Sequence, residues 1–388
     1  MVPVSLGSEQ LLASNLLAGA RVGLVANSAS IDHTFQHIAE RIATLSDTTL
    51  VALFGPQHGF YADVQDNMIE TGHGHHPRFN VPIYSLYSNT REPTATMLDG
   101  IDLLVIDLQD VGTRVYTYAY TMANCLRAAA RHNIRVIVCD RPNPIGGEGV
   151  EGPVLEHNFS SFVGQFSIPL RHGLTIGELA QLFNDHFEIG SELTISPLVG
   201  WSRDIYASEH DLPWIYPSPN LPTLDSAIVY PGTVLIEGTN LSEGRGTTRP
   251  FELIGAPDIK ANTLVMDLNA LDLPGVHFRP TTFEPTFQKY AGQTCGGCQI
   301  HVTDHRAFRP VVTGVAIIQA FRRLTGSQFA WRTPPYEYET TKMPIDILAG
   351  SDTLRQQIEL DRNATDIAQS WTDAIESFNV LRQRYLLY

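Results

Sequence analysis

The segment FGPQHGFYADVQDNMIE, residues 54–70, places many polar side chains directly behind an apolar run. Gln57 and His58 follow the glycine and proline that end the run, and Glu70 closes the segment after two aspartates. A carboxyl group can donate or accept a proton, whereas the amide of Gln57 can only form hydrogen bonds. The residue types therefore favour an acid/base site in which a carboxylate moves the proton.

A second polar cluster, DLQDVGTRVYTY, follows another apolar run. Its candidate ligand-binding side chains are Asp107, Gln109, Asp110, Arg114, Tyr116 and Tyr118. If the strand persists, Asp107 and Gln109 share one face and Asp110 lies on the other. We expect at least two of the six to contact a ligand. The alternative is a structural network in which Asp110 caps the next helix and Arg114 pairs with Asp107.

Two further strand ends carry arginine beside a second polar group. CDRPNP holds Arg141 and Asn143, and IPLRHG holds Arg171 and His172. A guanidinium binds carboxylates and sugar hydroxyls through parallel hydrogen bonds, so arginines aimed into one crevice would suit an anionic ligand. The alternative is that each arginine anchors a loop bent by proline.

The segment EGTNLSEGRGTTRPF contains too much glycine, serine and threonine for a regular element. Its hydrogen-bonding side chains are Glu237, Asn240, Glu243 and Arg245. Four such groups on one irregular segment predict the rim or lid of a pocket. The segment could instead wrap around a sheet edge without binding anything.

Other kinds of site lack their motifs. The three histidines of TGHGHHP have no H-E-x-x-H framework, and the C-G-G-C stretch has no second pair, so we expect no metal. The glycine runs match neither nucleotide-binding fingerprint, and the chain has no G-x-S-x-G elbow. We therefore expect no cofactor, and the remaining carboxylates, amides, tyrosines and arginines suit glycosidic acid/base chemistry.

The elements that must position these groups follow from the pattern of apolar residues. Apolar runs at 21–27, 49–55, 82–87, 101–110 and 135–142 predict strands, and 31–45, 117–133 and 174–187 have helical spacing. Strands that are apolar throughout, with helices between them, predict a parallel sheet covered on both faces. Such sheets bind ligands beyond the carboxyl ends of their strands, where the polar clusters fall.

The pattern of apolar residues changes near Pro257, after which β-like runs such as QIHVTD alternate with helices. We predict an α/β protein with a Rossmann-like catalytic domain over residues 1–256. A smaller α+β C-terminal domain is predicted over residues 257–388.

The composition narrows the possible partners. The 388 residues carry a formal net charge of −15 without a block of lysine and arginine, so a nucleic-acid partner is not expected. The first residues lack the features of a secretory signal, and no apolar run is long enough to span a bilayer. We expect a cytoplasmic protein without a membrane partner, and the oligomeric state stays open.

Taken together, the motifs resemble a known family, the exo-acting β-N-acetylmuramidases of the NamZ type. The segments that carry the resemblance are GLVANSASI, LFGPQHG, IDLLVIDLQDVGTRVYTY, VCDRPNP, SFVGQFSIPLRHGLTIGELA, PWIYPSPNLPT, YPGTVLIEGTNLSEGRGTTRPFELIGAP and the terminal YLLY. They cover nearly the whole chain in order. The resemblance implies a peptidoglycan glycosidase that removes N-acetylmuramic acid from the non-reducing end of a muropeptide or of MurNAc-GlcNAc. It places the active site in the N-terminal domain, where an arginine would bind the lactyl carboxylate.

The chain departs from this family at Gln57, because family members commonly have a glutamate there that is the proposed catalytic carboxylate. Glu70 is the first candidate to replace it as general acid, with Asp63 and Asp66 behind it. Alternatively Gln57 orients a water or the acetamido group while Glu243 is the acid. A third possibility is a muramyl-sugar-binding protein without activity. Retention or inversion of the anomeric configuration stays open.

Overall fold

A seven-stranded sheet dominates the first half of the chain in the computed structural model, which describes residues 1–66 and 68–388. Its strand order is β3-β4-β2-β1-β5-β6-β9, and neighbours pair in parallel except β3 and β4. The bounds are β1 (Arg21–Ala26), β2 (Thr49–Gly55), β3 (Gly74–His76), β4 (Val81–Ser85), β5 (Leu103–Asp107), β6 (Arg135–Cys139) and β9 (Leu193–Ser196). The predicted α/β class with a Rossmann-like parallel sheet is confirmed.

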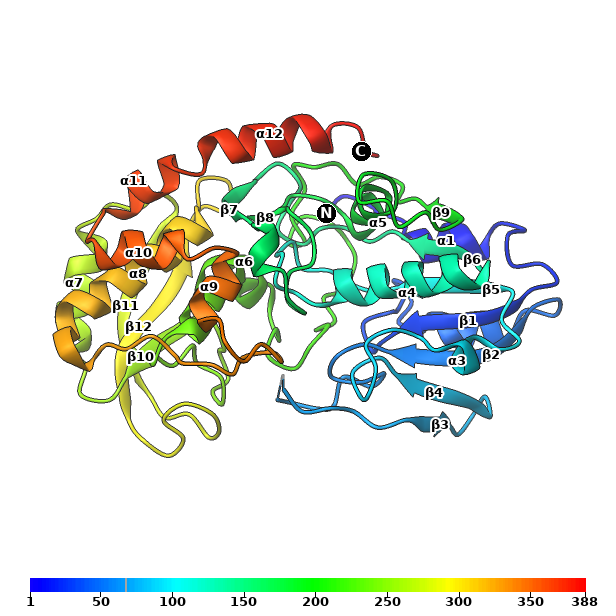
Figure 1. The fold of residues 1–388 in the computed structure, drawn as a ribbon, viewed down its shortest axis with the longest axis horizontal. Helices are drawn as coiled ribbons and strands as arrows, with labels where there is room; N and C mark the ends of the chain where they lie inside the picture. The colour runs from blue at the N-terminus through cyan, green and yellow to red at the C-terminus, as the bar shows by residue number, and fades with distance from the viewer. Residues whose placement is uncertain (67) are drawn as a thin grey trace.

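Helices cover both faces of this sheet (Figure 1). They are α1 (Gly7–Leu12), α2 (Ile38–Ala43), α3 (Ala95–Leu98), α4 (Tyr118–His132) and α5 (Ile176–Asp185). Side chains alternate along β5, so Leu104 packs in the core that contains α4 and α5, whereas Leu103 packs with α1 and α2. This explains why β1, β5 and β6 are apolar at every position except one terminal residue. Thr175 caps α5 together with Glu178, as predicted.

The second half contains a three-stranded antiparallel sheet of order β10-β12-β11. Its strands are β10 (Leu253–Ala256), β11 (Val276–Phe283) and β12 (Cys295–Val302), and a separate hairpin joins β7 (Glu151–Val154) to β8 (Pro169–Arg171). The α-helices are α6 (Leu224–Thr233), α7 (Ala261–Asn269), α8 (Pro310–Thr325), α9 (Pro344–Ala349), α10 (Thr353–Glu359), α11 (Ala364–Gln369) and α12 (Thr372–Arg382). The 3₁₀-helices are η1 (His157–Phe159), η2 (Val234–Gly238) and η3 (Gly326–Gln328).

The two halves are tied together at the C-terminus. In Figure 1, α12 runs back from the second half to the first. The hydroxyl of Tyr388 donates to Oδ2 of the buried Asp140, at the end of β6, over 2.8 Å. The predicted boundary at 256/257 falls between β10 and α7, so it would separate β10 from the sheet to which it belongs. The division at that point stays a prediction.

One predicted helix is shortened, and two segments without a predicted element are regular. The helix predicted over 31–45 is shortened to α2, because Asp32 accepts hydrogen bonds from the amides of Thr34 and Gln36 and holds a turn. The histidine-containing stretch forms edge strand β3. The proline and glycine of YPG lie within α6, where Gly232 lets this helix pack directly against α8. The chain then enters η2, which carries Glu237.

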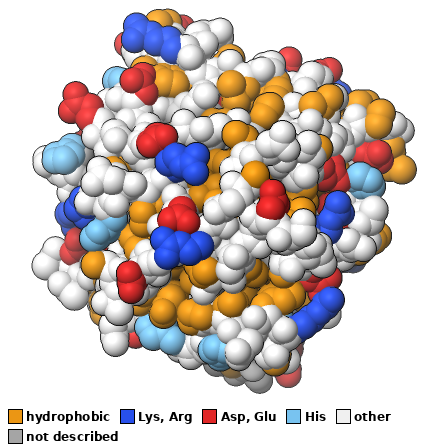
Figure 2. All heavy atoms as spheres, turned by 90° about the vertical axis from the view of Figure 1, so that its right-hand side faces the viewer, with side chains coloured by type: hydrophobic (Ala, Val, Ile, Leu, Met, Phe, Trp, Pro, Cys, Tyr) orange, Lys and Arg blue, Asp and Glu red, His pale blue; other side chains and the backbone are white. Residues whose placement is uncertain are grey.

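The surface at the sheet end of the molecule carries mixed charge. Figure 2 shows acidic and basic side chains interspersed with apolar ones on this face. Among the described residues, no helix combines the length and apolar character that a bilayer crossing requires.

Candidate active site

One cavity of about 500 Å³ is lined by residues from both halves of the chain. Gln57, His58 and Tyr116 come from loops that follow strands of the parallel sheet, and Glu237 and Glu337 come from the second half. The ribbon in Figure 1 shows the loop before α9, which carries Glu337, extending toward the first half. The loops after β2 and β5 therefore supply one wall, and the loops after α6 and before α9 supply another.

Gln57 lies two residues beyond β2 and is 5% exposed. The hydroxyl of Thr117, in the loop after β5, donates to Oε1 of Gln57 over 2.8 Å. With Oε1 bonded to Thr117, the amide NH₂ group faces the other side and can donate there. Gln57 also hydrogen-bonds the side chain of Glu337.

His58 forms the neighbouring part of the wall, with a backbone φ of 70°. Its Nδ1 lies 2.7 Å from the carbonyl oxygen of Val64. Since a carbonyl can only accept, Nδ1 must carry the proton in this contact. Burial lowers the pKa of His58 to about 4, so the ring is neutral near pH 7.

Glu237 is held by two donors from the second half. Arg245 Nη2 lies 2.7 Å from Glu237 Oε1, and the Tyr336 hydroxyl donates to Oε2 over 2.8 Å. Gly244 and Gly246 flank Arg245 at φ values of 77° and 81°, which side chains with a Cβ rarely adopt. These two glycines allow the backbone to direct Arg245 into the cavity. The segment contributes to the cavity wall, and its role as a pocket rim stays a prediction.

Glu337 is 4% exposed and accepts a hydrogen bond at Oε2 from the hydroxyl of Tyr87 over 3.2 Å. Burial is the main cause that raises the pKa of Glu337 to about 7, and the negative charge of Glu237 acts in the same direction. Tyr87, Arg245 and Gln57 oppose the shift without cancelling it. The two carboxyl groups of the cavity therefore have contrasting surroundings, one in an ion pair and one among mostly uncharged groups.

Glu243, predicted as an alternative acid, is buried beside this cavity and does not line it. Its Oε2 lies 3.0 Å from Lys289 Nζ, and its Oε1 lies 3.3 Å from Arg245 Nε. Although burial opposes the shift, Lys289 and Arg245 keep the pKa of Glu243 below its ordinary value. A carboxylate so strongly paired is poorly suited to donate a proton, and its evident effect is to hold Arg245 in place.

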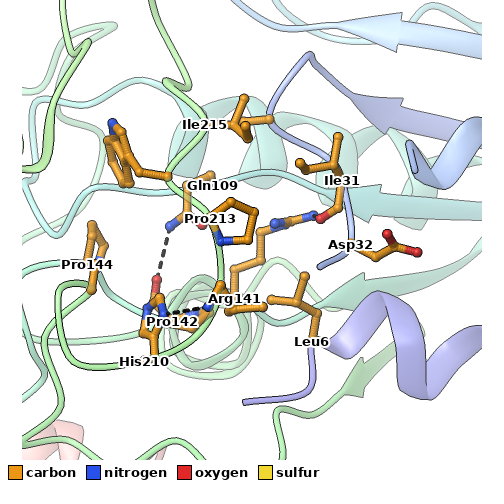
Figure 3. Close-up of a pocket in the computed structure, with 14 residues that line it drawn as sticks. Leu6, Ile31, Asp32, Gln109, Arg141, Pro142, Pro144, His210, Pro213 and Ile215 are labelled. Carbon is orange, nitrogen blue, oxygen red and sulfur yellow. Dashed lines mark hydrogen bonds between the residues drawn. The ribbon is translucent and has the colours of Figure 1, made fainter. Parts of the chain in front are cut away.

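A second cavity, of about 490 Å³, lies beyond the ends of β1, β5 and β6. Figure 3 shows Gln109 and Arg141 in its wall among prolines and aliphatic side chains, with the Gln109 amide bonded to the Pro142 carbonyl. Arg141 Nε and Nη2 contact the two oxygens of the fully buried Asp107 over 2.5 and 2.9 Å. Two predicted binding residues, Gln109 and Arg141, therefore line a cavity other than the one with the two carboxyl groups. Asp107 is the buried partner of Arg141.

Five other predicted binding residues are buried in structural contacts. Arg114 donates to the carbonyls of Pro153, Ile168 and Leu348, which connects the two halves. The remaining four form contacts within the first half of the chain. Arg171 donates to Ile145 O, Asn143 donates to Leu174 O, and His172 Nε2 lies 3.4 Å from Asp110 Oδ2. None of the predicted binding residues Arg114, Arg141 and Arg171 lines the cavity with Glu337.

Glu70 lies on the surface, outside the cavity wall. Its side chain is 48% exposed, and Oε1 lies 3.3 Å from Arg91 Nη2. Asp63 is exposed, and Asp66 accepts from the amide of Met68. Asn240 bonds Gln328 O and lines an open hollow on the second half. The structure thus does not bring Glu70 to the other candidate catalytic groups.

The predicted residues that do meet in the cavity are Gln57, His58, Tyr116, Tyr118, Glu237 and Arg245. Tyr336 and Glu337 line it too but were absent from the sequence-based candidates. They belong to the stretch PPYEYE, which follows no predicted strand and carries no motif. The only local signal is a proline pair followed by alternating aromatic and acidic residues.

The described part of the chain contains no group of three or more histidine, cysteine or carboxylate side chains placed to hold a metal ion. Of the three histidines that suggested metal in the sequence, His73 Nδ1 accepts from the Ser85 amide and His76 stacks on Phe79. The expectation of a metal-free site therefore stays a prediction that a chelator can test.

Comparison with known proteins gives matches to both halves of the chain. The model described as "Exo-beta-N-acetylmuramidase NamZ, N-terminal" matches residues 22–225, and the corresponding C-terminal model matches residues 228–388. The peptidoglycan beta-N-acetylmuramidase NamZ of Bacillus subtilis (strain 168) is 45% identical over 372 residues, which are 96% of this chain and 88% of that protein.

Two solved structures from Bacteroides fragilis NCTC 9343, both described as DUF1343 family proteins, are similar to the whole fold. One has a TM-score of 0.90 at 33% identity and covers 100% of both chains. The other has a TM-score of 0.75 at 26% identity and covers 99% of both chains.

Proposed function

The chain belongs to the NamZ family of exo-β-N-acetylmuramidases, and we propose that it removes terminal N-acetylmuramic acid from the non-reducing end of peptidoglycan fragments. The observation that carries this proposal is the cavity that holds Glu237 and Glu337 in contrasting surroundings. Glycosidases of the usual kind need one carboxyl group that gives a proton and a second carboxylate that supports the positive charge of the sugar. Two carboxyls with different environments divide these roles.

The lining of the cavity supports a sugar as its ligand. Tyr116, Tyr118 and Asn220 in the wall add aromatic surface and hydrogen-bonding groups of the kind that bind sugars. Because the chain also belongs to the NamZ family, the substrate is a peptidoglycan fragment such as MurNAc-GlcNAc or a muropeptide.

The purified protein is expected to release N-acetylmuramic acid from MurNAc-GlcNAc, followed by mass spectrometry, and nitrophenol from para-nitrophenyl β-N-acetylmuraminide. Activity should persist after treatment with a chelator, because carboxyl chemistry needs no metal. Cleavage inside a longer glycan, or loss of activity to the chelator with recovery on adding a divalent ion, would contradict the proposal.

One observation favours a second candidate function, a muramyl-sugar-binding protein. Gln57 stands where relatives commonly have a glutamate, and its amide cannot act as an acid. A binding protein would show saturable binding of N-acetylmuramic acid in calorimetry without any product. The cytoplasmic location also stays a prediction, which cell fractionation would test.

A further inference from the structure

Glu337 has the surroundings of a buried carboxyl group that can hold a proton near neutral pH. The titratable or charged groups around it include Tyr87 from the segment after β4, Tyr230 from α6, Glu237 from η2, Arg245 from the following loop and the adjacent Tyr336. Two of its hydrogen-bond partners, the Tyr87 hydroxyl and the Gln57 amide, are uncharged. Burial raises the pKa of Tyr87, so its hydroxyl stays a neutral donor.

The partner of Glu337 is oriented by an independent bond. Because the Thr117 hydroxyl occupies Oε1 of Gln57, the amide presents its NH₂ group to the Glu337 carboxyl. A glutamate at position 57 would instead place a third carboxylate beside Glu237 and Glu337. Neighbouring carboxylates share protons, so the identity of residue 57 determines which carboxyl group holds one.

The backbone conformation of the cavity wall supports a functional role for Glu337 and Gln57. His58, Phe251 and Glu337 line the cavity with φ values of 70°, 67° and 44°. A residue other than glycine in such a conformation is strained, and such residues cluster at functional sites. One of these residues is Glu337 itself, and another, His58, follows Gln57 in the chain.

We propose that Glu337 is the general acid of this chain, in place of the family's glutamate, and that Gln57 is a positioning residue that holds the Glu337 carboxyl. This inference rests on the proposed glycosidase function. As the bond from the anomeric carbon to the glycosidic oxygen breaks, Glu337 gives its proton to that oxygen and the shortened fragment leaves as an alcohol. Water supplies hydroxide to the anomeric carbon, and its remaining proton restores the acid form of Glu337 in the net reaction.

The test compares two leaving groups in wild type, Glu337→Gln and the matched control Glu376→Gln, at an exposed glutamate on α12. A sugar hydroxyl needs a proton in order to leave, whereas nitrophenolate leaves well without one. We therefore expect Glu337→Gln to lose about 10²- to 10³-fold in kcat on MurNAc-GlcNAc and less than about tenfold on para-nitrophenyl muraminide. Glu376→Gln should match wild type on both substrates.

Loss of both activities to the same extent in a folded Glu337→Gln protein would assign Glu337 a structural role and overturn the proposal. Retention of both activities would also overturn it. An inactive wild type would instead contradict the proposed function itself, which keeps the two failures separate. If wild type is nearly inactive and Gln57→Glu raises kcat by about 100-fold, the family's glutamate is required and Glu337 cannot replace it.

The pH profile gives a second measurement that does not depend on removing Glu337. Because the acid must be protonated, kcat/KM on the disaccharide should fall as pH rises through about 7. Tyr87→Phe removes a donor that favours the ionised form, so the alkaline limb should move to higher pH with the fold kept. An unchanged or lowered alkaline limb in Tyr87→Phe would overturn the role of Glu337.

Discussion

The Glu237→Gln variant is expected to lower kcat on MurNAc-GlcNAc by about 10³-fold or more. Glu237 is the charged carboxylate of the cavity, with Arg245 at 2.7 Å and the Tyr336 hydroxyl at 2.8 Å. Positive charge develops at the anomeric carbon in the transition state, and a fixed negative group beside it lowers the barrier. An amide keeps the shape of the side chain and removes that charge.

Loss of Glu237 should affect both leaving groups, because charge develops on the sugar whichever group departs. Kinetics on the disaccharide and on the nitrophenyl substrate therefore distinguish Glu237 from Glu337. The exposed Glu376 on α12 offers a matched control, since Glu376→Gln changes one carboxylate far from the cavity. Wild-type kcat in a folded Glu237→Gln protein would refute the role assigned to Glu237.

Substitution of Arg141 by alanine is expected to reduce the free energy of unfolding by about 3–5 kcal/mol. Asp107 is fully buried, and two nitrogens of Arg141 contact its two carboxylate oxygens. Without the guanidinium, a buried carboxylate at the carboxyl end of β5 would lack its counter-charge. Urea unfolding followed by circular dichroism measures the loss.

A double variant separates the ion pair from packing at this position. Asp107→Asn combined with Arg141→Ala loses the same packing as Arg141→Ala and removes both charges, and we expect it to recover part of the stability lost by Arg141→Ala, because no isolated charge remains. Equal instability of the two variants would show that the methylene packing of Arg141, rather than its charge, stabilises this region.

The parallel sheet was predictable because its central strands are apolar apart from one terminal residue each and a helix that covers it begins at a recognisable cap. β1, β5 and β6 are apolar since both faces are covered, and Thr175 with Glu178 marks the start of α5. Short elements were less predictable. A turn held by Asp32 takes the place of the first part of a predicted helix. The stretch around Gly232 resembles a loop in sequence, but it is helical because α6 packs tightly on α8 there.

The part of the site beside the sheet was also predictable, since Gln57 and Tyr116 follow strand ends. Glu337 was not, because its position depends on a loop that lies more than two hundred residues further along the chain. Arg114 and Arg171 have the residue type of ligand-binding groups but are bonded to backbone carbonyls, which no local pattern reveals. Glu70 lies near Gln57 in sequence, yet the chain carries it to the surface.

A crystal structure of Glu237→Gln with intact MurNAc-GlcNAc bound tests the central claim most directly. We expect the N-acetylmuramic acid ring in the cavity between Gln57 and Arg245, with the glycosidic oxygen within hydrogen-bond distance of the Glu337 carboxyl. Binding of the sugar in the cavity beside Arg141, or with its glycosidic oxygen facing away from Glu337, would contradict the claim.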